Sequence, residues 1–502
     1  MTSDDITPQQ SGGEMPSVRE PAAVGQYELF TLPFVQEVVA VGSERARLYQ
    51  RYADRLQVNP ALNRALVSFQ ANKATPFYRW LKYKEGFSSA FVSFMLDRFR
   101  PFGATSPAVL DPFAGSGATL TTATKAGWRA TGIELLPVGV QAIKARLHAD
   151  SVNPASFAYW LKRLEESPSA VDGGVEYRFP HLRITQKAFP EDTEASIGAY
   201  LALVEGIADE QVRFLFRFAC MASLEEVSFT RKDGQYLRWD QRAGKTAGSN
   251  FDKGVVYSFL PTVLGKLHMM AEDISNRNGD SFSGHVQIIN GSCLEHLPDL
   301  PADSFDLILT SPPYCNRYDY TRTYALELAF LGLGEEEVKR LRQTLLSATV
   351  ENRSKRAWLR EVYESRGASE RHGAAVAAFE KQAALQEVLD VLRLARVERR
   401  LNNNNVVGMV ENYFFEMSFV IHELARLLAP GGHVVMVNDN VQYVGEEAPV
   451  DLILSDFAAS AGLRVERIWV LPKGKGNSSQ QMGLHGRNEI RKCVYVWSKP
   501  IR

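Results

Sequence analysis

The segment that most constrains the fold is a glycine-rich loop, DPFAGSG at 111–117, which lies between a short apolar run and a helical pattern over 118–126. Gly115 and Gly117 allow the backbone to adopt positive φ angles or to approach a ligand closely. A second apolar run follows the helical pattern and ends in Glu134. The order strand, glycine loop, helix, strand and acid predicts the start of a βαβ unit, and therefore an α/β fold.

The acid at the end of the second strand indicates what the loop binds. Glu134 follows Asp111 at about the 20-residue spacing at which an acid meets the hydroxyls of a ribose. The helix after the loop presents free N–H groups toward a ligand. The loop lacks the Gly-Lys-Ser/Thr tail of a P-loop, and Asp111 favours a ligand with an ammonium or hydroxyl group over a pyrophosphate. We therefore predict a cofactor site here.

A second motif, TSPPY at 310–314, follows a strand pattern over 305–310. Two prolines cannot extend a central strand, and they leave neighbouring carbonyls free of ladder bonds. The Pro312 carbonyl and the Ser311 oxygen can then accept both N–H bonds of an exocyclic base amine, whose lone pair is otherwise delocalised into the ring. Tyr314 can stack on the face of that base. The motif predicts a site for an amine on a planar base.

Five segments, DPFAGSG, GIE, IINGSC, TSPPY and LAPGGHVVMV, together resemble the motifs of S-adenosylmethionine-dependent DNA amino-methyltransferases. The resemblance covers residues 77–150, 285–334 and 405–502. It implies a Rossmann-like methyltransferase fold with a doubly wound, mostly parallel sheet and largely helical insertions. Alternating runs over 464–471 and 492–497 predict an antiparallel C-terminal hairpin that closes this sheet. Serine at the start of SPPY favours cytosine N4 in this family, whereas Asp or Asn favours adenine N6.

The resemblance implies roles for individual residues. Ser311, Pro312, Pro313 and Tyr314 would be catalytic. The cofactor would contact Phe87, Ser88, Asp111, Phe113, Gly115, Gly117, Glu134, Ser292 and Cys293. Ser292 and Cys293 lie at the adenine position, where the family often has Asp. The methyl group would pass directly to the amine, largely by positioning, after the base leaves the duplex.

Other chemistries are disfavoured by the residues present. Cys315 lacks the Pro-Cys arrangement of a nucleophile for 5-methylcytosine formation, and we interpret it as a packing residue. The nine histidines form no ligand cluster and no HExxH motif is present, so we predict no metal site. The four cysteines form no CxxC pair, which disfavours a disulfide framework or structural zinc. With no apolar signal-peptide core and no run long enough to span a membrane, we predict a cytoplasmic protein without membrane contact.

A nucleic-acid partner is disfavoured by the net charge of −1, but the charge is uneven along the chain. Residues 464–502 hold nine Lys or Arg against two Glu, a local charge of +7. Aromatic residues are interleaved with basic ones over 231–253, as in an element that recognises a DNA target. The predicted DNA contacts are Arg231, Lys232, Arg238, Arg242, Arg317, Tyr320, Lys473, Lys475 and Arg487.

The 502 residues are best explained by one catalytic sheet that is interrupted twice. The expected parts are a disordered tail at 1–25, the catalytic domain at 26–150, 285–334 and 405–502, a candidate target-recognition insertion at 151–284, and a helical insertion at 335–404.

We therefore expect a site-specific bacterial DNA methyltransferase that acts on cytosine N4 in double-stranded DNA, in restriction–modification or phage defence. A cognate restriction endonuclease is a candidate partner. Three alternatives stay open: adenine-N6 methylation of DNA, methylation of an RNA amine, and a cofactor-binding regulator or DNA-binding module without catalysis. The residues define neither the recognition sequence nor the oligomeric state, and either insertion or both could read DNA.

Overall fold

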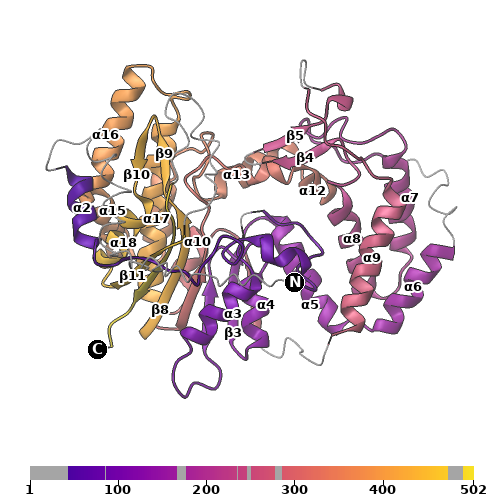
Figure 1. Ribbon diagram of the computed structural model, residues 1–502, viewed down its shortest axis with the longest axis horizontal. Coiled ribbons are helices and arrows are strands. Elements are labelled where there is room, and N and C mark those ends of the chain that lie inside the picture. Colours follow the sequence, from indigo (N-terminus) through magenta and orange to yellow (C-terminus); the bar gives the residue numbers. More distant parts are fainter. Residues whose placement is uncertain are drawn as a thin grey trace, which may run out of the picture.

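The computed structural model describes residues 43–84, 86–166, 177–233, 236–245, 250–277, 285–472 and 490–501. The predicted tail at 1–25 lies outside these residues. Figure 1 shows a sheet covered by helices on the left and a group of helices on the right.

An eight-stranded sheet forms the centre of the catalytic part, in the order β1-β11-β12-β8-β7-β2-β3-β6. Neighbouring strands are parallel except at β12, which is antiparallel to both β11 and β8. The predicted doubly wound, mostly parallel sheet with an antiparallel C-terminal hairpin is confirmed. The strands are β1 (Leu56–Val58), β2 (Ala108–Asp111), β3 (Arg129–Glu134), β6 (Val286–Asn290), β7 (Phe305–Thr310), β8 (Leu428–Asp439), β11 (Arg464–Val470) and β12 (Lys492–Ser498).

The central strands are buried on both faces, because helices cover each side of the sheet. Val109 and Leu307 belong to the core of one face, and Leu110 and Ile308 to the core of the other. This pattern explains why these strands read as continuous apolar runs. The first face is covered by α3 (Ser89–Arg98), α4 (Ala118–Lys125) and α5 (Pro137–Ser151), and the second by α10 (Cys293–His296), α17 (Val406–Leu427) and α18 (Val450–Ser460).

The insertion at 151–284 forms a helical layer with its own core, seen at the right of Figure 1. Its helices pack against α5 and against α12, which follows the TSPPY motif. A two-stranded hairpin that the sequence did not predict lies beside this layer. The elements are α6 (Pro154–Glu166), α7 (Thr193–Glu205), α8 (Glu210–Ser223), α9 (Phe259–Ser275), β4 (Thr230–Asp233), β5 (Tyr236–Trp239), the 3-10 turn η3 (Gln241–Ala243) and, after the motif, α11 (Tyr320–Thr323) and α12 (Ala325–Phe330).

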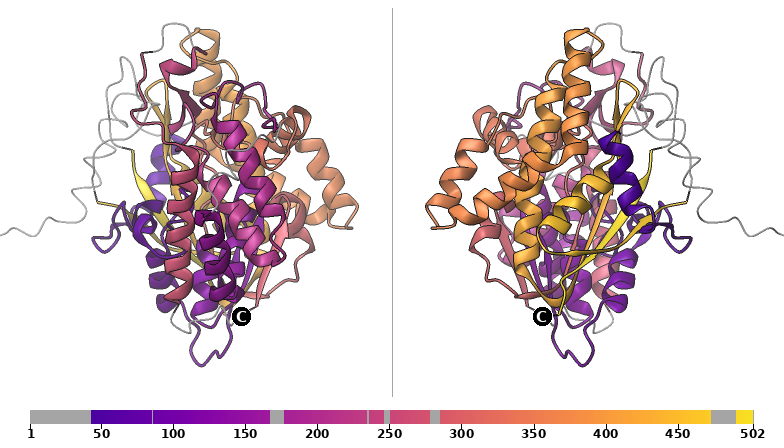
Figure 2. Two further views of the ribbon diagram at one scale, coloured as in Figure 1. Left: turned by 90° about the vertical axis from the view of Figure 1, so that its right-hand side faces the viewer. Right: turned by 90° about the vertical axis from the view of Figure 1, so that its left-hand side faces the viewer.

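The second insertion is helical, as its pattern indicates. Its last helices pack on α17, where Phe379 meets Phe415 edge to face with ring centroids 5.4 Å apart. Figure 2 shows these helices in orange, in front of the sheet in the right-hand view. The elements are α13 (Glu335–Thr344), α14 (Arg356–Glu364), α15 (Ser369–Lys381) and α16 (Ala383–Val397).

The first described helix, α2 (Glu44–Tyr52), is tied to parts of the chain far from it in sequence. The Arg45 guanidinium is 4% exposed and pairs with Glu387 at 2.6 Å and with Glu446 at 3.0 Å. The strand β1 that follows adds to the edge of the sheet at β11. The remaining elements are the 3-10 turns η1 (Phe69–Ala74) and η4 (Leu297–Asp299) and the small hairpin β9 (Val441–Tyr443) with β10 (Glu446–Ala448).

Candidate active site

The glycine loop makes the turn from β2 into α4 that the sequence predicts. Gly115 and Gly117 have φ angles of 55° and 81°, a region that favours glycine. A Cβ atom on Gly117 would lie 2.5 Å from Cγ1 of Ile143, and one on Gly115 would lie 3.3 Å from Cε1 of Tyr83. Both positions therefore need glycine, and the loop backbone stands directly against the Tyr83 ring.

Asp111 ties this loop to the end of β7. Its carboxylate is 1% exposed and accepts hydrogen bonds of 2.7 Å from the hydroxyls of Thr119 and Thr310. It also accepts a bond of 3.1 Å from the Phe113 amide. Burial raises the pKa of Asp111 to about 6, and these hydrogen bonds act against that rise. Because its oxygens are engaged inside the protein, Asp111 holds the loop in place and does not line the neighbouring cavity.

Glu134 lies at the end of β3, where the sequence predicts it. Its carboxylate accepts hydrogen bonds from the Gly115 amide at 2.5 Å and the Leu136 amide at 2.6 Å. Burial raises the pKa of Glu134 to about 8, in spite of these two bonds. The acid thus joins the loop and the start of α5 at the wall of a cavity.

This inner cavity brings together segments from across the sheet. Its walls hold five of the predicted cofactor contacts, Ser311 and Pro313 of the SPPY motif, and two leucines that follow α13. Leu345 and Leu346 were not predicted, because no local pattern marks a loop in a distant insertion. The predicted residues in the wall are Phe113, Gly115, Glu134, Ser292, Cys293, Ser311, Pro313 and Tyr320.

Phe87 and Ser88 do not reach this cavity. The Ser88 hydroxyl caps α3 by accepting a bond of 3.1 Å from the Phe91 amide, and it donates to the Leu66 carbonyl at 2.6 Å. The Phe87 ring packs against Phe91 in the core. The segment instead reaches the cavity through Tyr83. Gly117 also lies outside the cavity lining, where its role is the turn into α4.

The SPPY motif directly follows β7 and lies between the inner cavity and a second, outer cavity. The Ser311 hydroxyl donates to the Val437 carbonyl at 3.1 Å and lies 3.3 Å from the Tyr314 hydroxyl oxygen. Cys315 is fully buried, which raises the pKa of its thiol above the usual value and suits the packing role predicted for it. Ser311 and Tyr83 line both cavities.

The outer cavity is larger than the inner one, about 320 Å³ against about 60 Å³. Tyr314 lines it, and the Lys492 ammonium lies 6.0 Å from the centroid of the Tyr314 ring. Lys492 also pairs with Asp439. Among the described residues of this wall, cations outnumber carboxylates: Arg64, Lys73, Lys82, Lys84 and Lys492 against Asp439.

Comparison with known proteins identifies the family. Two proteins named type II methyltransferase M.AvaI, from Nostoc sp. and Anabaena variabilis, are each 44% identical to this chain over 476 residues. Each match covers 93% of this chain and 95% of the relative. The type II methyltransferase M.BsoBI of Geobacillus stearothermophilus is 38% identical over 479 residues, or 91% of this chain and 92% of the relative. The chain belongs to the type II DNA methyltransferases. No protein-family model matches it.

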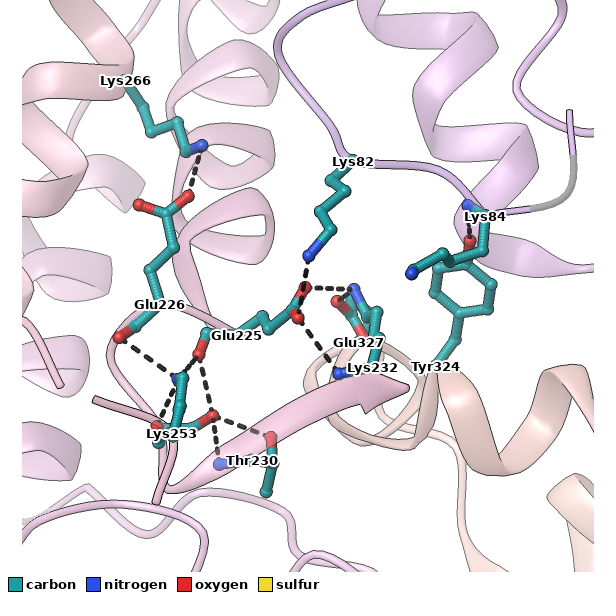
Figure 3. Close-up of polar contacts among 11 residues, drawn as sticks. Lys82, Lys84, Glu225, Glu226, Thr230, Lys232, Lys253, Lys266, Tyr324 and Glu327 are labelled. Atoms are coloured by element: carbon teal, nitrogen blue, oxygen red, sulfur yellow. Dashed lines mark hydrogen bonds and ion pairs between the residues drawn. The ribbon is translucent and has the colours of Figure 1, made fainter. Parts of the chain in front are cut away.

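One of the methyltransferase's predicted DNA contacts is corrected by the structure. Side chains alternate along β4, so Arg231 is exposed and Lys232 is buried. The Lys232 ammonium forms an ion pair with Glu327 and is therefore not available to a DNA phosphate (Figure 3). Lys253, in the same basic segment, also turns inward and donates to the Ser228 carbonyl at 2.6 Å.

The other predicted contacts of the methyltransferase are spread over several surfaces. Arg238 is exposed on β5 and pairs with Asp233 at 3.0 Å, whereas Arg242 is held by Asp240 at 2.7 Å. Arg317 is half-buried, and Tyr320 lines the inner cavity. Lys473, Lys475 and Arg487 lie outside the described residues.

A buried ionic cluster holds the loop after α13 over the inner cavity of the methyltransferase. The Glu416 carboxylate accepts bonds from the amide and hydroxyl of Ser347, at 2.8 and 2.5 Å, and from the Lys355 ammonium at 2.9 Å. Leu345 and Leu346 come directly before Ser347 in this loop and line the cavity. Across it, the Ser292 hydroxyl donates to the Thr344 carbonyl at 3.4 Å. The helical insertion thus supplies one wall of the inner cavity.

The described part of the methyltransferase has neither a membrane-spanning helix nor a metal-binding cluster. No described helix combines the length and apolar character needed to cross a bilayer. Within the same residues, no group of three or more His, Cys, Asp or Glu side chains is arranged to hold a metal ion.

Proposed function

We propose that this methyltransferase transfers the methyl group of S-adenosylmethionine to N4 of a cytosine flipped out of double-stranded DNA. The observation that carries the proposal is the pair of cavities that share Ser311 and Tyr83 as a common wall. One cavity is narrow and largely apolar, and the other is roomy and rich in cations. A methyl donor in the first and a nucleotide in the second would meet at the SPPY motif.

The inner cavity suits S-adenosylmethionine. Phe113, Leu345 and Leu346 offer apolar surface for a purine, and the Glu134 carboxylate has lone pairs that could accept bonds from ribose hydroxyls. When bound there, the cofactor would supply a methyl group activated by a positively charged sulfur. The surrounding residues would exclude water and fix the direction of that group.

The outer cavity suits a nucleotide. Its lysines and arginine would bind phosphates of the DNA backbone, and the Tyr314 ring would stack on the flipped base. The Ser311 hydroxyl proton is already donated to the Val437 carbonyl, so its lone pairs are free to accept an N–H of the base amine. With the Pro312 carbonyl, this would direct the amine lone pair toward the methyl group.

Restriction–modification is the biological setting that we propose. The relatives are named as type II methyltransferases, and a methylated base at a specific site would protect DNA from an endonuclease that reads the same site. The cytosine assignment rests on Ser311 at the first motif position.

The test of this function is nucleoside analysis of duplex DNA incubated with the protein and isotopically labelled S-adenosylmethionine. We expect labelled N4-methylcytosine. Sequencing of modified bases in a host that expresses the chain would give the recognition sequence and show whether one site is modified. N6-methyladenine alone would contradict the cytosine assignment, and transfer to RNA but not to duplex DNA would contradict the DNA substrate.

Catalysis can be separated from binding with two variants. Ser311→Ala and Tyr314→Ala should each lower kcat by about 100-fold, because they disturb the position of the base. Both should keep their affinity for S-adenosylhomocysteine, measured by calorimetry, within about twofold, since cofactor contacts depend mainly on other residues. Unchanged methylation in both variants would contradict the site.

A further inference from the structure

The buried Lys232 ammonium connects the β4–β5 hairpin to the helix that follows the SPPY motif. Lys232 is 3% exposed, forms an ion pair with Glu327 of α12, and lies 3.8 Å from the Glu225 carboxylate (Figure 3). The Glu327 side chain is 1% exposed. Removing both charges from water is costly, and the pair is favourable only in a narrow range of geometries. The contact therefore fixes the hairpin against α12.

An aromatic pair extends this contact to the shared wall of the cavities. The Lys232 ammonium lies 4.8 Å from the centroid of the Tyr324 ring, within the range of a cation–π contact. Tyr324 stacks on Tyr83, with ring centroids 5.3 Å apart and 24° between the planes. Its hydroxyl accepts a hydrogen bond of 2.7 Å from the Lys84 amide. A displacement of Lys232 would thus move the Tyr324 ring, and Tyr324 in turn contacts Tyr83 directly.

A second connection runs through Glu225. Its carboxylate accepts a bond of 3.0 Å from the Lys232 amide and pairs with Lys82 at 3.2 Å. Lys82 and Tyr83 are consecutive residues, and both line the outer cavity. Lys232 is therefore joined to the 82–84 segment twice, by its backbone amide through Glu225 and by its side chain through Tyr324. Neither Lys232 nor Glu327 is among the residues that line the two cavities.

We propose that Lys232 is a positioning residue for methyl transfer. Together with Glu327 it holds Tyr324, and through Tyr324 it holds Tyr83 in the wall between cofactor and target base. The inference rests on the assignment of the two cavities in the function proposed above. Arg231, the preceding residue, is exposed on the opposite side of the strand, so one face of β4 is open to DNA while the other supports the site.

The test compares two lysines of the same insertion. Lys232→Met removes the charge beside Tyr324, whereas Lys245→Met removes an ammonium that bonds backbone carbonyls of residues 183, 184 and 186 and has no described contact with Tyr324 or Glu225. We expect Lys232→Met to raise the Kd for S-adenosylhomocysteine about tenfold in the absence of DNA. Its kcat should fall by about 100-fold, because a small displacement of the wall misaligns the reacting groups. Lys245→Met should bind the same ligand within about twofold of the wild type.

Two further variants separate positioning from stability. Glu327→Gln keeps the side-chain shape and should also raise the Kd. The double variant Lys232→Met with Glu327→Leu replaces the ion pair by apolar groups, which should recover much of the Tm, while the Kd stays high. A double variant that recovers both Tm and affinity would overturn the inference, as would an unchanged Kd in Lys232→Met. Absence of S-adenosylhomocysteine binding by the wild type would instead refute the proposed function.

Discussion

Glu134 shows how one residue can serve both the fold and the site. Burial of the carboxylate favours its protonated form, and the backbone amides of Gly115, Leu135 and Leu136 only partly offset the loss of water. Such a group costs stability whenever it is ionised. It is nevertheless the acid that the spacing from Asp111 predicts for a ribose, so we interpret the cost as the consequence of placing a hydrogen-bond acceptor in a ligand cavity.

The ionisation of Glu134 should make the free energy of unfolding of the protein depend on pH. Its pKa rises from the usual 4.5 to about 8 on folding, so between these values the folded state holds a proton that the unfolded state has released. The free energy of unfolding therefore falls as the pH rises through this window. Between pH 6 and pH 8 the wild type should lose about 2 kcal/mol relative to Glu134→Gln, whose amide does not titrate.

Urea unfolding of both proteins at the two pH values measures this difference. The comparison between wild type and variant cancels the titration of all other groups. Parallel changes in the two proteins would show that Glu134 ionises normally in the folded state.

Residues that belong to a recognisable motif could be predicted for the site, and residues outside any motif could not. Phe113, Gly115 and Glu134 belong to one βαβ unit, whose local order already determines that they meet. Leu345 and Leu346 reach the same cavity from a separate insertion, and apolar residues at a helix end resemble ordinary core. Only the folded arrangement gives them a role.

The β4–β5 hairpin shows the same limit at the scale of an element. Its strands, TRKD and YLRW, have four residues each and lack an apolar alternation that would predict them. The basic residues of this segment favour DNA contact, yet pairing in the hairpin turns Lys232 inward. Charge composition predicts that this segment contacts DNA, but strand geometry determines which of its cations face solvent.

The loop after α13 should line the inner cavity correctly only while the Glu416 carboxylate holds it in place. Glu416→Gln removes the charge that holds Ser347 and Lys355, so the Kd for S-adenosylhomocysteine should rise about tenfold as Leu345 and Leu346 lose their support. Calorimetry measures this change directly.

Glu411→Gln is the matched control for this prediction. Glu411 lies on the same helix, α17, and pairs with Arg356 at 3.2 Å and with Arg393 at 3.4 Å, with no described bond to Ser347 or Lys355. The affinity of Glu411→Gln for S-adenosylhomocysteine should stay within about twofold of that of the wild type. Equal losses in the two variants would indicate a general loosening of α17.

At the scale of the whole molecule, long-range contacts join parts that composition treats separately. The net charge of −1 is an average over an acidic N-terminal segment and a basic C-terminal one, so it says little about DNA. The order of motifs predicted one sheet with a C-terminal hairpin, because strands and loops follow each other regularly. It did not predict that β1 completes the edge at β11, since three residues carry too weak a signal.

Arg45 should contribute strongly to the stability of the whole protein. Arg45→Met leaves the carboxylates of Glu387 and Glu446 without this partner, so the free energy of unfolding in urea should fall by about 3 kcal/mol. Arg47→Met, on the same helix, removes an exposed pair with Glu44 and should cost less than about 1 kcal/mol. Similar losses in both variants would mean that the contacts of α2 with α16 and β10 add little.

The pairing of β1 with β11 also determines when, during synthesis of the chain, the sheet can be completed. Leu56 lies opposite Ile468, so the edge strand waits for roughly 400 further residues, about 20 to 80 s at ordinary rates of synthesis. All residues that line the inner cavity are made well before then, the last of them Leu346. The residues that line the inner cavity are thus synthesised early, and β11, with which the edge strand β1 pairs, is synthesised late. The nascent chain therefore passes through a long interval in which the parts of the site are present but the completed sheet is not.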